Sequence, residues 1–159
     1  MNGWYGKVLR VDLTNQTHTI ETVDPQFAKD YIGGRGWAIR YLMDGMDPKA
    51  DALSPENILI FATGPLTGSP APTGNRYMVV TKSPLTGVLT NSNSGGDFPT
   101  WMKRTGFDLF IFEGRAEKPV YLWVNDDQVE IRPAGHIWGK QVPETTDMML
   151  AETHPKAKV

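Results

Sequence analysis

The chain of 159 residues is 40% hydrophobic and 21% charged, which is typical of one globular domain with a substantial core. Its net charge of −2 argues against general binding to nucleic acid or membrane surfaces. Its lack of cysteine excludes disulfides, thiolate metal ligands and a thiol nucleophile within the sequence. No signal peptide or long apolar run is recognisable, so we expect a cytoplasmic protein.

The first part of the sequence predicts two strands followed by two helices. Leu9, Val11 and Leu13 alternate with polar residues, which is the pattern of a half-buried strand. Asp24 before Pro25 is a helix-start signal, because a capping side chain is followed by proline in the first turn. In chain order we expect strands at 4–14 and 17–23 and helices at 25–32 and 35–43.

The rest of the chain alternates strands and short helices. Residues 57–63 form a nearly all-apolar run, which predicts a strand buried on both faces. The later predicted elements are strands at 76–81, 107–113, 119–124 and 128–132 and helices at 97–105 and 144–153. With roughly seven or eight strands and about four short helices, the sequence predicts an α+β fold.

The segment 64–96 has an unusual composition for the middle of a domain. It holds six Gly, four Pro, nine Ser or Thr and three Asn, and the run without Asp or Glu extends back to residue 57, over 40 residues. Its only full charges are Arg76 and Lys82. Glycines allow close approach of backbone amides and no carboxylate is present, so the segment suits an anionic ligand.

The same segment repeats itself. The tetrapeptide Pro-Leu-Thr-Gly occurs at 65–68 and again at 84–87, on either side of the predicted strand at 76–81. Proline followed two or three residues later by glycine is typical of turns, so we expect a sheet with two similar turns at its rim. The alternative is that two ordinary turns happen to match.

Two candidate ligand contacts stand in this segment. Residues 91–96 lie between a strand and a predicted helix, where free amides favour phosphate; alternatively, Ser94 or Asp97 merely caps the helix. Arg76 is suited to a phosphate, or else to a surface ion pair. No Ser/His/Asp arrangement, P-loop or dinucleotide fingerprint is present, so we assign no catalytic residue.

Several stretches, in this order, resemble the N-terminal domain of the aldehyde:ferredoxin oxidoreductases, which are tungsten bis-pyranopterin enzymes. The stretches are GKVLRVDLT at 6–14, GGRG at 33–36, GPLTGSPAPTGNRYMVVTKSPLTG at 64–87, NSNSGG at 91–96, FEGRAEKPVYL at 112–122 and HIWGK at 136–140. The resemblance covers essentially the whole chain. It implies a two-sheet, mostly antiparallel base with pseudo-twofold character, on which two pyranopterins lie.

The resemblance also implies roles for particular residues. The family arginine matching Arg76 sits between a pterin and the iron–sulfur cluster. The asparagine matching Asn93 contacts the cofactor and offers its backbone carbonyl to a magnesium ion that links the pterin phosphates. The glycine matching Gly95 lies against a phosphate, and we include the neighbouring Ser94 and Gly96 in the expected cofactor-binding set.

The family oxidises aldehydes to carboxylates with ferredoxin as electron acceptor, and the sequence does not decide between tungsten and molybdenum. Family members are much longer, and their later part supplies the cysteines of a four-iron iron–sulfur cluster. The resemblance therefore implies that residues 1–159 are a tungstopterin-binding N-terminal domain without the downstream cysteine-bearing domains, and inactive alone. A fragment, a truncated product and a subunit of a split enzyme remain open, as does a homodimer.

Two places depart from the family pattern. Asn75 stands where glycine is common, and residues 99–101 stand where glycine, a small residue and an acidic residue are usual. Two other functions also stay open: a non-catalytic binding or assembly module that kept the fold, and a free-standing binder of phosphate ligands. Neither a nucleic-acid nor a membrane partner is expected.

Overall fold

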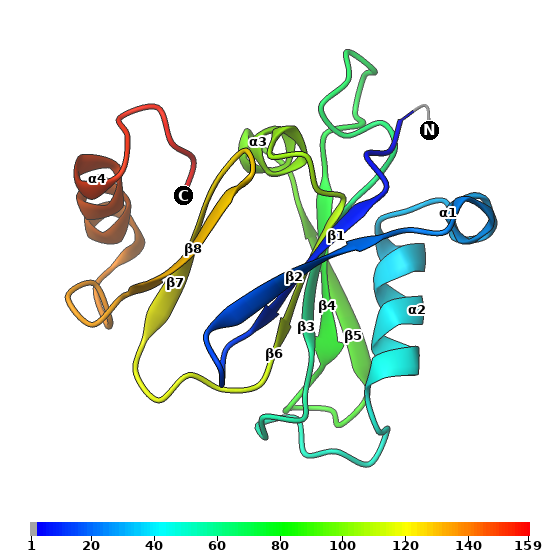
Figure 1. Ribbon diagram of the computed structural model, residues 1–159, viewed down its shortest axis with the longest axis horizontal. Coiled ribbons are helices and arrows are strands. Elements are labelled where there is room, and N and C mark those ends of the chain that lie inside the picture. Colours follow the sequence, from blue (N-terminus) through cyan, green and yellow to red (C-terminus); the bar gives the residue numbers. More distant parts are fainter. Residues whose placement is uncertain (1–2) are drawn as a thin grey trace.

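A mixed six-stranded sheet forms the centre of the protein, whose structure is a computed structural model that describes residues 3–159. Its strands are β1 (Lys7–Asp12), β2 (Thr17–Thr22), β3 (Leu59–Thr63), β4 (Tyr77–Lys82), β5 (Leu89–Ser94) and β6 (Leu109–Glu113). They lie in the order β2-β1-β6-β3-β4-β5 (Figure 1). β1 and β6 are parallel, and the other neighbouring pairs are antiparallel. β5 is therefore an edge strand.

Two helices, α1 (Pro25–Tyr31) and α2 (Arg35–Gly45), cover one face of this sheet (Figure 1). The Asp24 side chain accepts hydrogen bonds from the backbone N–H groups of Gln26 and Phe27, which confirms the predicted helix start. The helix residues Trp37, Ala38 and Leu42 are buried against the sheet. The sheet side of this core is Val8, Ile60, Ala62, Val80, Leu109 and Ile111.

The opposite face of the sheet is covered by a second, two-stranded antiparallel sheet and a short helix. These elements are β7 (Val120–Asn125), β8 (Gln128–Pro133) and α3 (Phe98–Arg104). Leu9 and Val11 of β1 face this side, and β1 is therefore buried on both faces. The alternation of apolar and polar residues had predicted burial on one face only. The last helix, α4 (Val142–Glu152), lies beyond the β7–β8 hairpin (Figure 1).

The structure confirms the α+β class, with two sheets and four helices among residues 3–159. The pseudo-twofold character stays a prediction. The two Pro-Leu-Thr-Gly turns follow β3 and β4, which are antiparallel, so the turns lie at opposite ends of the sheet. Within the described residues, no helix is long and apolar enough to cross a membrane.

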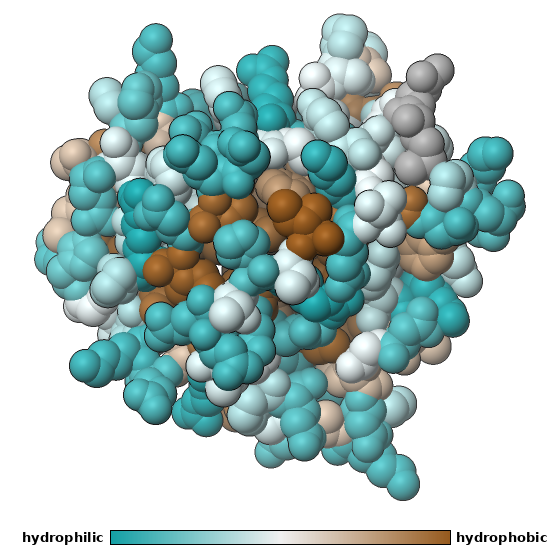
Figure 2. All heavy atoms as spheres, in the orientation of Figure 1, coloured by the Kyte–Doolittle hydropathy of each residue, from teal (hydrophilic) through white to brown (hydrophobic). Residues whose placement is uncertain are grey.

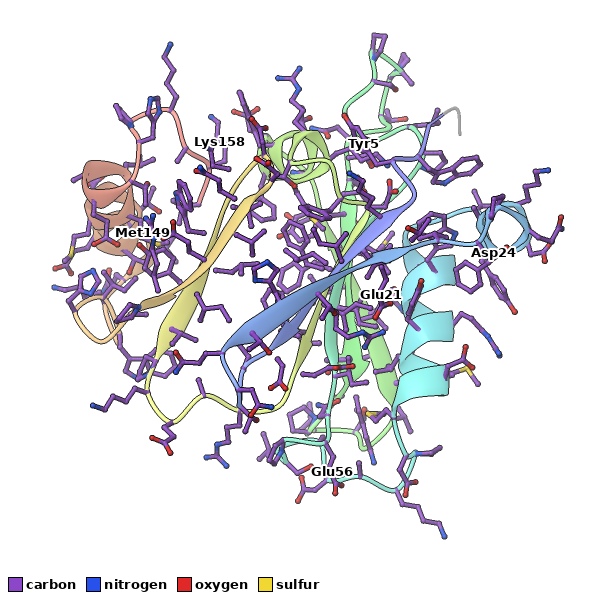
Figure 3. The ribbon with its side chains drawn as sticks, viewed as in Figure 1. Tyr5, Glu21, Asp24, Glu56, Met149 and Lys158 are labelled. Carbon is purple, nitrogen blue, oxygen red and sulfur yellow. The ribbon has the colours of Figure 1, made fainter. Side chains whose placement is uncertain are left out.

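A buried ion pair joins α3 to the ends of β1, β3 and β6. Lys103 and Asp108 are hydrogen-bonded, and their side chains are 7% and 0% exposed. The other carboxylate oxygen of Asp108 accepts the backbone N–H of Gly6 at 2.6 Å, and Lys103 Nζ also donates to the carbonyl of Gly64 at 3.3 Å. Tyr5, labelled in Figure 3, lies with its ring centroid 5.9 Å from Lys103 Nζ. The pair thus fixes the loop that begins at Gly64.

Replacing Lys103 by methionine should strongly destabilise the fold, because it leaves the Asp108 carboxylate buried without its cation. We expect Lys103→Met to lower the free energy of unfolding by about 3–5 kcal/mol in urea titrations. Lys140→Met is the matched control, since Lys140 forms an exposed pair with Glu144 on the protein surface. That change should cost only about 0.3–0.5 kcal/mol. Equal small losses in both variants would contradict a structural role for the buried pair.

Candidate functional site

Arg76 and Asn93 lie together at one end of the six-stranded sheet. Asn93 on β5 is paired with Met78 on β4, and Arg76 stands two residues before Met78 on the same side. Arg76 Nη1 donates a hydrogen bond to Asn93 Oδ1 at 2.6 Å. Both side chains are exposed. We call the site formed by Arg76 and residues 93–96 the cradle.

The hydrogen-bond register of β4 and β5 sets the direction of the Asn93 backbone. Ser83 N–H donates to the carbonyl of Val88 at 2.9 Å, and the register places these two residues opposite each other. Bonded and non-bonded pairs alternate along an antiparallel ladder, so the Met78–Asn93 pair is non-bonded. The N–H and C=O groups of Asn93 therefore point away from β4, out from the free edge of the sheet.

This edge lacks the usual protection of a sheet margin. All six residues of β5 are exposed, and the strand carries no charge and no proline. Soluble proteins normally blunt such an edge with lysine, proline, a bulge or a covering segment, because its free backbone groups pair readily. The free N–H and C=O groups of β5 are therefore available to a ligand.

The charges around the cradle favour an anion. Within residues 3–159, no carboxylate lies within 4.0 Å of the Arg76 guanidinium, so the predicted alternative of a surface ion pair is not formed. Asp97, the first acid after the segment, pairs with Lys158 at 2.9 Å. Lys82 lies at the far end of β4 and donates to the carbonyls of Pro48 and Ala50. Arg76 is thus the cation of the cradle.

The segment 91–96, expected to lie between a strand and a helix, is itself mainly strand, and Asp97 is the N-cap residue of α3. Ser94 ends β5, and neither Ser94 nor Asp97 makes a side-chain cap on α3, which has seven residues. The cradle therefore depends on the edge of β5 more than on a helix end. Gly96 has a φ of +79°, which favours glycine, and a Cβ there would meet nothing within 4 Å. Open space thus adjoins Gly96.

Three residues support the cradle through contacts that the sequence did not predict. Thr67, in the first tetrapeptide, is buried; its Oγ1 accepts the N–H of Gly64 at 3.1 Å and donates to the carbonyl of Arg76 at 2.9 Å. Asn75 donates to the carbonyl of Gly96 at 2.5 Å and accepts from Thr100 Oγ1 at 2.7 Å. The two departures from the family pattern therefore touch each other and connect the cradle to α3.

Residues 3–159 contain no group of three or more His, Asp or Glu side chains arranged to hold a metal ion. A hard cation at the cradle would instead meet the outward backbone carbonyl of Asn93 and the oxygens of an anionic ligand. Backbone carbonyl and phosphate oxygens are suitable ligands for Mg²⁺. The donor set at the cradle therefore fits a phosphate-bearing group with a bound magnesium ion.

Comparison with known proteins places the chain in one family. Residues 8–159 match the family described as "Aldehyde ferredoxin oxidoreductase, N-terminal domain". A tungsten-containing aldehyde ferredoxin oxidoreductase of Pyrococcus horikoshii is 54% identical over 98% of this chain and 26% of its own length. An aliphatic sulfonate oxidoreductase, WOR-like subunit, of Pyrococcus furiosus is 34% identical over 99% of this chain and 26% of its own.

One solved structure has the same fold. The active site complex BamBC of benzoyl coenzyme A reductase, in complex with 1,5-dienoyl-CoA, superimposes with a TM-score of 0.92 at 40% identity. The match covers 95% of this chain and 23% of that chain. This protein thus spans about a quarter of the length of the relatives it matches.

The two tetrapeptides provide a matched test of the support under Arg76. Thr67→Val should leave the N–H of Gly64 and the carbonyl of Arg76 without their partner, and should lower the free energy of unfolding by about 1–3 kcal/mol. Thr86→Val changes the equivalent, exposed residue of the second tetrapeptide and should cost less than about 0.5 kcal/mol. Chemical denaturation checks both values. A similar loss in both variants would count against Thr67 as the anchor of the cradle.

Proposed function

This chain belongs to the aldehyde ferredoxin oxidoreductase family, and from that membership and the geometry of the cradle we propose that it binds the pterin cofactor of a tungsten oxidoreductase. The observation that carries the proposal is the Arg76–Asn93 hydrogen bond beside the outward backbone of β5. It places one unneutralised cation, a carboxamide and free backbone groups at a single point. A phosphorylated pterin needs donors of this kind.

Each cradle residue has a role in the proposal. Arg76 binds and orients one pterin, and Asn93 Oδ1 keeps the guanidinium in place. The backbone carbonyl of Asn93 would be a ligand for a magnesium ion bound together with the phosphates. Ser94, Gly95 and Gly96 border the phosphate, where a Cβ at Gly95 would meet only the Asn75 carbonyl, at 3.5 Å.

The metal–pterin group, when bound, would supply the two-electron oxidation of an aldehyde to a carboxylate, with water as the oxygen source and ferredoxin as electron acceptor. The residues of this chain would hold and orient that group, and none of them is proposed to act on the aldehyde. A four-iron iron–sulfur cluster would need cysteines from outside this sequence, which has none. Molybdenum could replace tungsten without any change in the cradle, because the cradle residues would contact the pterin and magnesium and would not contact the tungsten or molybdenum.

The relatives support a division of labour between this span and the rest of a longer protein. Proteins that share the domain are named for an aldehyde, an aliphatic sulfonate and a benzoyl-CoA substrate, although each match covers only about a quarter of their length. We therefore propose that this span provides the cofactor base and that other domains or a partner subunit select the substrate. The cytoplasmic location and a homodimer stay predictions.

Loss of the Arg76 guanidinium should reduce cofactor loading. The test is a chimera in which this chain replaces the matched quarter of the Pyrococcus horikoshii relative, expressed with tungsten and analysed for bound metal and pterin. A charged hydrogen bond contributes about 1.5–3 kcal/mol, so Arg76→Ala should weaken retention of the cofactor at least about tenfold.

Arg115→Ala is the control for that chimera, since Arg115 follows β6 at the other end of the sheet and is also exposed. It should leave tungsten and pterin content unchanged. A folded chimera that carries neither metal nor pterin would contradict the proposed function. Equal tungsten and pterin content in the Arg76→Ala and Arg115→Ala chimeras would show that Arg76 does not contribute to cofactor binding.

The chain itself offers a simpler test with magnesium pyrophosphate as a stand-in for the phosphate groups. Calorimetric titration should show binding that Arg76→Ala weakens about tenfold. Asn93→Ala keeps the backbone carbonyl and loses only the side-chain contact to Arg76, so its loss should be smaller, about twofold to threefold. A larger loss of affinity for Asn93→Ala than for Arg76→Ala would show that the Asn93 carboxamide, and not its backbone carbonyl, holds the magnesium ion.

A further inference from the structure

A cavity of about 710 Å³ lies on the face of the six-stranded sheet opposite α2. The sheet contributes Phe61 and Phe112 to its wall, and α4 contributes Met149. Figure 2 shows apolar surface gathered in a hollow near the middle of the view. Met149 and Lys158, both lining residues, lie on the hairpin side of the molecule in Figure 3. No cradle residue lines this cavity, so it is a separate site.

One wall of the cavity is the free edge of β7. Every residue from 121 to 126 lines it, whereas no residue of β8 does. Ala134 N–H donates to the carbonyl of Pro119 at 2.8 Å, so these two opposite residues form a hydrogen-bonded pair. Hydrogen-bonded and non-bonded pairs alternate along the β7–β8 ladder from this pair onward. Leu122 is in a non-bonded pair with Ile131, and Val124 is in one with Val129. The backbone N–H and C=O groups of Leu122 and Val124 therefore point out from the edge, toward the cavity.

The two-stranded sheet is small for its position. An isolated hairpin of two strands is marginally stable, and an exposed edge beside apolar surface readily pairs with another strand. Here one face of the hairpin is packed on the six-stranded sheet, while the edge of β7 opens into an apolar space. The combination of a hydrogen-bonding edge and apolar walls suits an extended polypeptide better than a small apolar molecule.

The charged side chains that line the cavity are mostly basic. Arg104, Lys156 and Lys158 line it, together with a single acidic side chain, that of Asp126. Within the described part of the chain, neither Arg104 nor Lys156 has a carboxylate within 4.0 Å, whereas Lys158 is paired with Asp97. The cavity therefore favours a carboxylate at one end of the segment that enters it.

We infer that β7 accepts an added strand: an extended segment with apolar residues at alternate positions and an acidic residue near one end. Its backbone pairs with Leu122 and Val124, its apolar side chains contact Phe61 and Phe112, and its carboxylate meets Arg104 or Lys156. The source is the polypeptide that full-length relatives carry outside the matched span, since the match covers only 26% of the Pyrococcus horikoshii protein. The inference is independent of cofactor binding at the cradle.

The experiment uses this chain and overlapping peptides of about ten residues taken from that unmatched region, a length typical of strands. Binding is measured by fluorescence anisotropy of labelled peptides, and amide hydrogen exchange reports on Leu122 and Val124. We expect at least one alternately apolar, acid-ended peptide to bind and to protect both amides. N-methylation of its alternate amides should abolish binding without any change in the protein.

Matched proline variants locate the edge. Leu122→Pro removes an outward N–H on β7 and should weaken binding of that peptide at least tenfold. Ile131→Pro, directly opposite on β8, makes the same change at the other edge and should leave binding within about twofold. Failure of every peptide to bind the folded chain would overturn the inference. Binding that survives both Leu122→Pro and N-methylation, or protection absent from Leu122 and Val124, would overturn it equally.

Discussion

The hydrogen-bond ladder between β4 and β5 is the constraint on which the cradle depends. Its register puts Arg76 and Asn93 on the same side of the sheet, where the guanidinium donates to the carboxamide. The same register turns the backbone groups of Asn93 outward at a free edge. A slip of one residue would reverse both directions at once. Thr67 and Asn75 then fix the loops that enter and leave this ladder.

Several charged side chains of the fold are paired with one another, whereas Arg76, the proposed cofactor contact, has no charged partner within the described residues. Lys103 and Asp108 neutralise each other in the interior, and Arg10 is held between Glu21 and Glu113. Arg76, by contrast, has one neutral partner and faces solvent. An arginine without a carboxylate partner is suited to binding an anionic ligand, because a neighbouring carboxylate would compete for the same N–H donors.

The sequence predicted the class of the fold well and the local form of the cradle less well. Apolar alternation and the Asp24–Pro25 signal located the strands and helices that bury side chains. No strand was predicted at 89–94, where all six residues are exposed, and β5 is a strand through its backbone pairing with β4. Composition identified the acid-free segment, but no local pattern could show that Thr67 reaches Arg76 or that Asn75 reaches Thr100. Such contacts depend on the tertiary arrangement.

The position of a bound cofactor tests the cradle most directly. Crystals of a cofactor-loaded assembly that contains this chain would locate the metal by its anomalous scattering at a tungsten absorption edge, and the pterins by their electron density, without any mutation. We predict a magnesium ion about 2.1 Å from the Asn93 carbonyl oxygen, with the Arg76 guanidinium against a pterin. Pterin phosphates bound elsewhere, with the edge of β5 open to solvent or covered by protein alone, would contradict the account.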